Sequence, residues 1–214
     1  LGRQPNVDGL NLEAAGVEAD ASGVQVDAEM RTSQPHIFAV GDVNGLHEIV
    51  HIAIRQGEIA AFNAAHPDRP PHRIDDRLNM LVVFSDPQVA SVGLTEAAAV
   101  AAGHEVRIGK FPFAGNGKAI ALGEAEGLVK TVFDAKSGEL LGAHMIGAEV
   151  TELIQGYAIA QTLETTEAEL MHTIFPHPTL SEMMHEAVLD AYGWHDISTD
   201  CAFLLDYAID EETW

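Results

Sequence analysis

Residues 176–182, with the sequence PHPTLSE, combine residue types that could carry out acid-base chemistry. Prolines on both sides of His177 stiffen the backbone, and the following proline disfavours the helical region for this residue. A histidine exchanges protons near neutral pH, and a carboxylate bonded to one ring nitrogen sets the tautomer at the other. Glu182 lies five residues after His177. The segment therefore predicts a histidine-glutamate pair that accepts and donates protons.

The same residues also fit a simpler structural interpretation. Thr179 and Glu182 have the S/T-x-x-E spacing of a capping box, in which the glutamate only satisfies backbone groups at the start of a helix. Gly193 is placed to end that helix, and His177 becomes a surface turn residue. Both interpretations remain open at this point. The apolar positions that predict the helix are Leu180, Met183, Met184, Ala187, Val188 and Ala191.

A second candidate site is the H-E-x-x-H pattern at residues 47–51. In zinc peptidases two histidines one helical turn apart bind the metal, and the glutamate acts as a base. Such a site needs a third ligand, and His51 is not followed by the glycine and histidine of the commoner extended form. Because the chain contains 11 histidines, a chance match is easily reached. We therefore keep a zinc hydrolase as an alternative and expect no metal site.

The composition excludes several classes of partner. A formal net charge of -22, from 33 acidic and 11 basic residues, argues against nucleic acids and anionic membranes. No apolar run approaches the roughly 20 residues that span a bilayer, and no targeting sequence opens the chain. Cys201 is the single cysteine, which excludes an internal disulfide. We expect a cytoplasmic protein without a nucleic acid or membrane partner.

The first 78 residues have a pattern typical of α/β architecture. Short strands are predicted at residues 23–27 and 36–40, and the second leads through Gly41 and Asp42 into a helix. Ligands of open α/β sheets bind where strands run out into helices, so the Asp42 carboxylate could accept hydrogen bonds from sugar or polyol hydroxyls. The alternative is an ordinary turn aspartate. A proline- and arginine-rich link at residues 67–77 then predicts a domain boundary.

The pattern beyond this boundary predicts an antiparallel sheet covered by helices, an α+β fold. Helices are predicted from Thr95, over residues 149–163, and from Thr166, whose spacing to Glu169 again fits a capping box. The last two strands are joined by a turn, as in a hairpin. The predicted strands are residues 80–84, 89–92, 106–111, 128–133 and 140–146.

Five segments, in the same order along the chain, together resemble the flavin-dependent pyridine nucleotide-disulfide oxidoreductases. The similarity runs from residue 1 to about residue 193, and five ordered matches are more specific than any one of them. The segments are LGRQPN at 1–6, TSQPHIFAVGDV at 32–43, DPQVASVGLT at 86–95, residues 140–147, and HPTLSE at 177–182.

The resemblance implies a division of the chain into three parts. Residues 1–78 correspond to the end of the region that binds FAD and NAD or NADP. Residues 79–193 correspond to an interface domain that forms a homodimer. Residues 194–214, which include Cys201 and an acidic end, match nothing in the family and stay unassigned.

The resemblance also implies roles for particular residues. His177 is similar to a catalytic acid/base that enters the site of the partner subunit, and Glu182 to the carboxylate that orients it. The H-E-x-x-H residues are then assigned to flavin rather than to zinc. The implied cofactor-binding positions are Gly41 and Asp42 for the ribityl chain of FAD, the backbone of Glu48, Ile49, Val50 and His51 for the flavin ring, and Gly2 for NAD or NADP.

Two details favour one branch of the family. Leu180 in HPTLSE is typical of the branch that acts on lipoamide, and the retained histidine-glutamate pair speaks against the mercuric reductase branch. Phe175 departs from the pattern, since many lipoamide enzymes have a second histidine there. We expect a small dithiol or disulfide substrate, namely lipoamide carried on an acyltransferase complex. A glutathione reductase-like or NAD(P) transhydrogenase-like enzyme is the alternative.

Two features of a complete enzyme of this family are missing from the sequence. The chain has no G-x-G-x-x-G fingerprint and no pair of redox-active cysteines. We therefore expect it to be the C-terminal part of a longer flavoenzyme and to be inactive by itself. A non-catalytic dimerisation module is the alternative description.

Overall fold

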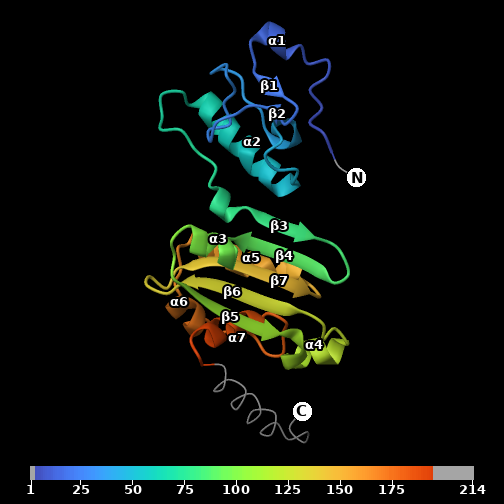
Figure 1. Ribbon diagram of the computed structural model, residues 1–214, viewed down its shortest axis with the longest axis vertical. Helices are drawn as coiled ribbons and strands as arrows, with labels where there is room; N and C mark the ends of the chain where they lie inside the picture. Colours follow the sequence, from blue (N-terminus) through green and yellow to red (C-terminus); the bar gives the residue numbers. More distant parts are fainter. Residues whose placement is uncertain (1–2, 195–214) are drawn as a thin grey trace, which may run out of the picture. The chain divides into compact units, whose positions relative to one another are not determined.

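The computed structural model describes residues 3–194, so Gly2 and the tail with Cys201 lie outside the described residues. The chain divides into two compact units, Leu1–Asp76 and Arg77–Trp214, which differ in architecture (Figure 1).

The N-terminal unit is built around one long helix, α2 (Val50–Ala65). This helix buries Ile52, Gln56, Ile59, Ala60 and Asn63 on one side, with the spacing expected for an amphipathic helix. The other elements are short: α1 (Leu12–Ala15), the antiparallel strands β1 (Ala19–Asp20) and β2 (Gly23–Val24), and the 3-10 helix η1 (Gly41–Asn44).

The predicted strand at residues 36–40 is wrong, and the one at residues 23–27 is too long. Strand β2 covers only Gly23–Val24, and residues 36–40 form a single bridge, from Phe38 to Arg31. A strand requires a continuous ladder of hydrogen bonds with a neighbour. Here the neighbouring segment turns at Met30, whose φ of 64° lies in the left-handed region and interrupts an extended backbone.

The C-terminal unit is a five-stranded antiparallel sheet with the order β3-β4-β7-β6-β5. All five strands were predicted, and their observed ends differ by no more than one residue from the prediction, because alternation and turn residues mark them clearly. The α+β prediction is confirmed. The strands are β3 (Met80–Val83), β4 (Gln88–Gly93), β5 (Val106–Pro112), β6 (Leu128–Asp134) and β7 (Leu140–Gly147).

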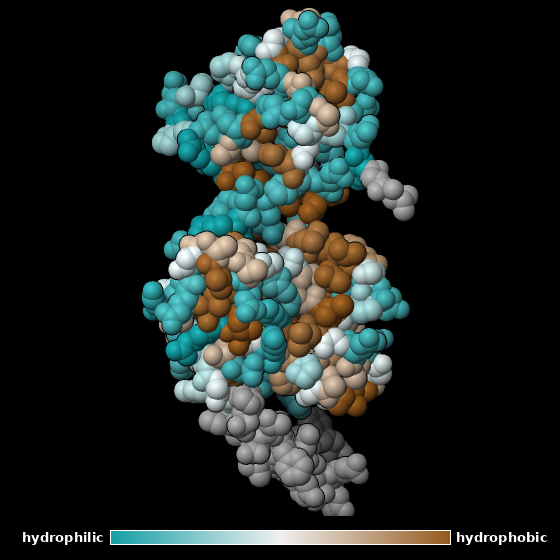
Figure 2. All heavy atoms as spheres, viewed as in Figure 1, coloured by the Kyte–Doolittle hydropathy of each residue, from teal (hydrophilic) through white to brown (hydrophobic). Residues whose placement is uncertain are grey.

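Helices cover one face of this sheet, where α5 packs against β4 and β7, and α7 against β5 and β6 (Figure 1). On the opposite face α3 packs against Val132 and Leu141, and the rest of that face is more open, with Leu81, Val83 and Ile146 exposed. Figure 2 shows apolar side chains gathered in patches on the surface of this unit. The helices are α3 (Glu96–Ala101), α4 (Gly117–Leu122), α5 (Val150–Thr162), α6 (Glu167–His172) and α7 (Glu182–Ala191), with 3-10 turns η2 (Asp76–Leu78) and η3 (Phe113–Gly115).

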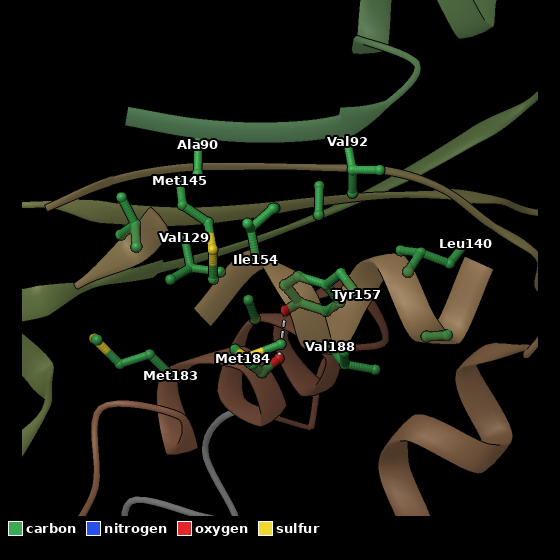
Figure 3. Close-up of a cluster of buried hydrophobic side chains, with 14 of the residues drawn as sticks. Ala90, Val92, Val129, Leu140, Met145, Ile154, Tyr157, Met183, Met184 and Val188 are labelled. Carbon is green, nitrogen blue, oxygen red and sulfur yellow. Dashed lines mark hydrogen bonds between the residues drawn. The ribbon is translucent and has the colours of Figure 1, made fainter. Parts of the chain in front are cut away.

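The main core lies between the sheet and helices α5 and α7 (Figure 3). Val129, Met145 and Ala90 are neighbours across three strands and point toward the helices. Tyr157 on α5 is fully buried, and its hydroxyl donates a hydrogen bond of 2.7 Å to the carbonyl of Met184 on α7. Burial raises the pKa of the Tyr157 phenol, so the hydroxyl keeps its proton and remains a donor. This bond ties the two helices together.

Helix α7 lies unusually close to strand β5, and the contact requires a glycine. A Cβ atom at Gly109 would lie 1.8 Å from the carbonyl oxygen of Ala187 and 2.7 Å from the hydroxyl oxygen of Thr131. The Thr131 hydroxyl donates to the same Ala187 carbonyl at 3.1 Å, and the Lys110 amide donates to the Asp190 carboxylate at 2.7 Å. These contacts fix the helix that follows the predicted histidine-glutamate segment.

We expect Gly109→Ala to lower the free energy of unfolding by about 1–3 kcal/mol, because the added methyl group forces α7 away from the sheet. Gly117→Ala is the matched control, since a Cβ there meets nothing within 4 Å. Its expected effect is within about 0.5 kcal/mol. Urea denaturation of both variants checks the prediction, and equal stabilities would contradict it.

The turn between β6 and β7 is organised by one carboxylate. Asp134 accepts hydrogen bonds from the backbone amides of Lys136 (2.8 Å) and Ser137 (3.0 Å), and its other oxygen accepts one from His104 Nδ1 at 2.6 Å. The pKa of Asp134 is held well below its usual range, chiefly by the His104 hydrogen bond and then by the two backbone amides. The ionised carboxylate is therefore the form that the folded hairpin requires.

A carboxyl group whose pKa is lower in the folded state adds stability above its unfolded pKa, about 4, and loses it as the pH falls below that value. We expect Asp134→Asn to lower the melting temperature at neutral pH, and the difference from the wild type to shrink below about pH 4. Glu124→Gln, at an exposed position of the same unit, is the control. A melting-temperature difference between Asp134→Asn and the wild type that does not depend on pH would contradict the lowered pKa of Asp134.

Candidate functional site

The predicted histidine-glutamate pair is formed in the loop between α6 and α7. His177 Nδ1 lies 2.8 Å from Glu182 Oε1, a hydrogen-bond distance. A carboxylate can only accept, so Nδ1 carries a proton, and in the neutral ring Nε2 then has a free lone pair. Among residues 3–194 no hydrogen-bond partner of Nε2 is found. The His177 side chain is 58% exposed, so this nitrogen is open to a reacting group.

The predicted capping box at Thr179 and Glu182 is only half formed. Glu182 Oε2 accepts a hydrogen bond of 2.8 Å from the Thr179 amide, as the box requires. The Thr179 hydroxyl instead donates to the carbonyl of Pro176 at 2.6 Å, and α7 begins at Glu182 with Ser181 as its N-cap. The helix therefore starts later than predicted. Its other end is as predicted, because Gly193 has a φ of 73° and its amide donates to the Asp190 carbonyl.

Two contacts anchor this loop to the rest of its unit. Leu180 is 9% exposed and belongs to the main core. The Asn116 side chain donates a hydrogen bond of 3.0 Å to the Thr179 carbonyl. Sequence reasoning missed Asn116, because it lies 63 positions before Thr179 and nothing local in the sequence signals their contact.

The segment around Asp42 is held by a buried glutamine. Gly41 has a φ of 75°, and its amide donates to Gln56 Oε1 at 2.7 Å. The side chain of Asn44 donates to the same oxygen at 3.0 Å. Gln56 is fully buried on α2, so it fixes the short helix that carries Asp42. Sequence reasoning did not predict this contact between Gln56 and the Gly41 segment.

Asp42 is itself paired with Arg3, which sequence reasoning also missed. The Arg3 guanidinium contacts the Asp42 carboxylate, and its Nε lies 3.8 Å from Glu48 Oε2. The Asp42 side chain is 42% exposed. The structure thus brings together residues 39 positions apart, Arg3 from the start of the chain and Asp42 from η1.

The start of helix α2 lies a few residues after this carboxylate. Glu48 and Ile49 precede the helix, and Val50 and His51 form its first turn. The N-cap residue Ile49 provides no side-chain hydrogen bond to the first amides. Leu46, Val50 and Ile54 expose 53%, 77% and 60% of their surface. An exposed apolar surface next to an uncapped helix start fits a flat, partly apolar ligand with acceptor atoms.

The geometry required by the H-E-x-x-H zinc motif is not formed. The motif needs both histidines one turn apart on one helix, but α2 begins at Val50 and His47 precedes it. His47 Nε2 instead lies 3.4 Å from Asp76 Oδ1. Within residues 3–194 no group of three or more histidine, cysteine, aspartate or glutamate side chains could hold a metal ion. In the same range, no helix is both long and apolar enough to cross a bilayer.

The comparisons with known proteins agree with this architecture. Residues 80–188 match the family described as the pyridine nucleotide-disulphide oxidoreductase dimerisation domain, and residues 1–57 match the family described as pyridine nucleotide-disulphide oxidoreductase. The chain therefore belongs to the pyridine nucleotide-disulphide oxidoreductase family, and the predicted resemblance is confirmed.

Individual relatives show which members of this family the chain is similar to. The dihydrolipoyl dehydrogenases of Zymomonas mobilis and Rhizobium etli are each 54% identical to this chain, over 193 and 198 residues that cover 90% of it. A crystal structure of LpdA from Mycobacterium tuberculosis matches with a TM-score of 0.81 and 29% identity, covering 88% of this chain and 41% of that one. The chain spans 41% and 40% of the length of the two curated relatives.

Proposed function

We propose that this chain is the C-terminal portion of a flavin-dependent disulfide oxidoreductase that oxidises dihydrolipoamide with NAD. The observation that carries the proposal is the bond between His177 Nδ1 and Glu182 Oε1, in a loop of the unit that matches the family's dimerisation domain. The 54% identity to two dihydrolipoyl dehydrogenases supports the choice of substrate. The chain supplies the acid/base pair and the dimer interface, and it is inactive without the rest of the enzyme.

The proposed role of His177 follows from its tautomer. With Nδ1 donating to Glu182, Nε2 can accept the proton of a substrate thiol. The resulting thiolate attacks a redox-active disulfide elsewhere in the enzyme and forms a mixed disulfide. Attack by the second thiol of the substrate releases lipoamide and leaves the enzyme dithiol reduced. Bound FAD would supply the route by which the two electrons of this dithiol reach NAD, giving NADH and one proton.

Glu182 has two proposed tasks in this step. It keeps the imidazole in the tautomer that presents Nε2, and it stabilises the imidazolium once the proton has arrived. Its position does not depend on the histidine alone, because Oε2 is held by the Thr179 amide. The carboxylate is therefore in place before the proton moves, and this preorganisation favours the transfer.

The N-terminal unit fits the proposed FAD site. The half-exposed Asp42 carboxylate can accept hydrogen bonds from the hydroxyls of the ribityl chain, next to the Gly41 backbone. The backbone of Glu48, Ile49, Val50 and His51 would hold the flavin ring at the uncapped start of α2, where apolar side chains are exposed. Gly2 is proposed for NAD or NADP, and it lies outside the described residues.

The proposed assembly is a homodimer in which His177 enters the active site of the partner subunit. The match to a dimerisation domain and the exposure of the His177 ring support it. The proposed physiological substrate is lipoamide attached to an acyltransferase complex. A glutathione reductase-like or transhydrogenase-like enzyme would use the same acid/base pair on another substrate.

A second candidate function is a dimerisation module without catalysis. The match at residues 80–188 favours it, because that description gives dimerisation as the task of this part of the oxidoreductase family. It differs from the first proposal in requiring no flavin, no thiol substrate and no role for the His177 ring.

We expect His177→Gln, in the complete flavin-loaded enzyme, to lower turnover of dihydrolipoamide by about 10²- to 10⁴-fold, because the base is lost. Glu182→Gln should also lower turnover, since the amide cannot stabilise the imidazolium. Bound flavin, measured by absorbance, should stay at the wild-type level. His172→Gln, at an exposed position on α6, is the matched control. Normal turnover of His177→Gln would reject the acid/base role and favour the dimerisation module.

We expect this chain to form a homodimer at micromolar concentration. Light scattering coupled to size exclusion should give twice the 22.9 kDa mass of one chain. A monomer at micromolar concentration would count against the proposed entry of His177 into the partner's active site. It would also count against the dimerisation module.

A further inference from the structure

Asn116 makes two hydrogen bonds with the two ends of its amide. Its oxygen accepts from the Ala119 backbone amide at 2.8 Å, which makes it the N-cap of α4. Its nitrogen donates to the Thr179 carbonyl at 3.0 Å. The Asn116 residue is 6% exposed, so its bond to Ala119 is buried and its bond to Thr179 is partly buried. One buried side chain thus joins the start of α4 to the loop that carries His177.

Thr179 is held on both sides of its Cα atom. Asn116 fixes its carbonyl, and Glu182 Oε2 accepts from its amide at 2.8 Å. Glu182 Oε1 in turn accepts from the His177 ring at 2.8 Å. A continuous series of hydrogen bonds therefore runs from α4 through Thr179 and Glu182 to the imidazole.

The Asn116 bond is the loop's one external hydrogen bond within the described part of the chain. The other bonds of residues 176–182 stay inside this segment or join it to α7, including the Thr179 hydroxyl bond to the Pro176 carbonyl. Burial of the Leu180 side chain anchors the segment but does not fix its rotation, because apolar contacts have no direction. The orientation of the Thr179 backbone consequently depends on Asn116.

We propose that Asn116 is a positioning residue for the His177–Glu182 pair, an inference that rests on the proposed function. The geometry requires an acceptor for the Ala119 amide and a donor for the Thr179 carbonyl on one short side chain. The amide of asparagine provides both, whereas an aspartate carboxylate only accepts. Loss of the donor frees the Thr179 backbone, and the Glu182 carboxylate and the ring it orients lose their fixed direction.

The test uses the complete flavin-loaded enzyme with Asn116→Asp and Asn116→Ser. Both substitutions keep a good N-cap for α4. Aspartate has no donor for the Thr179 carbonyl, and serine offers one shorter hydroxyl in place of the two ends of the amide, so it cannot reach both partners. We expect each to lower kcat about tenfold, the effect of one lost buried hydrogen bond, with KM and flavin content unchanged. The matched control is Thr95→Ala, which removes the N-cap bond of α3 at 3.1 Å; within residues 3–194, Thr95 makes no hydrogen bond to residues 176–182. It should leave kcat unchanged.

Two further measurements separate positioning from a general loss of stability. Near pH 9 the substrate thiol, with an ordinary pKa of about 8.5, ionises without help, so the defect of the Asn116 variants should shrink. In a His177→Gln background, Asn116→Asp should lower kcat by less than about twofold more, because both changes act on the same step. If the double variant loses kcat by the product of the two separate losses, the inference is overturned. Wild-type kcat in both single Asn116 variants would overturn it as well.

Failure of the proposed function has a different signature. If His177→Gln alone keeps normal turnover, the acid/base role is rejected, and hydrogen exchange of residues 176–182 then decides the anchoring role of Asn116. Faster exchange in both Asn116 variants but not in Thr95→Ala supports anchoring, and unchanged exchange overturns it. If neither Asn116 variant folds, the inference is also overturned, because a positioning residue can be replaced without loss of the fold.

Discussion

The close packing of helix α7 on the sheet is the constraint on which the C-terminal unit depends. On one side the helix approaches strand β5 so closely that only a glycine fits at Gly109. On the other side the Tyr157 hydroxyl holds the Met184 carbonyl. Because the helix is fixed from both sides, its first residue, Glu182, has a defined place relative to the sheet. The loop before it is then positioned by hydrogen bonds to that end of the helix and by the Asn116 bond to the Thr179 carbonyl.

The Glu182 carboxylate divides its two oxygens between structure and the proposed chemistry. Oε2 accepts from the Thr179 amide, as a capping glutamate does, and Oε1 accepts from the His177 ring. The two interpretations of this segment are therefore not exclusive, because one carboxylate has enough lone pairs for both. Because the bond to the Thr179 amide already orders the Glu182 side chain, orienting the imidazole costs little further conformational entropy.

The strands of the C-terminal unit could be predicted closely because their signals are local. Alternation with a period of two, together with glycine, proline and polar turns, marks each strand without reference to its partner. The N-terminal unit was predicted less well. Residues 36–40 are as apolar as a strand, yet they form a single bridge, from Phe38 to Arg31. A ladder depends on the course of a second segment, which local composition does not contain.

The sequence by itself determined the family, the sheet and the histidine-glutamate pair, because these rest on ordered motifs, periodicity and a spacing of a few residues. Only the tertiary structure decided what holds the candidate sites: Asn116 at the Thr179 carbonyl, Gln56 at the Gly41 amide and Arg3 at Asp42. It also showed that α2 begins after His47, so the H-E-x-x-H residues do not have the helical geometry that the zinc motif needs. The physical reason is the same in each case: dihedral preference and burial are local properties, whereas a hydrogen bond or ion pair between distant residues exists only once packing has brought them together.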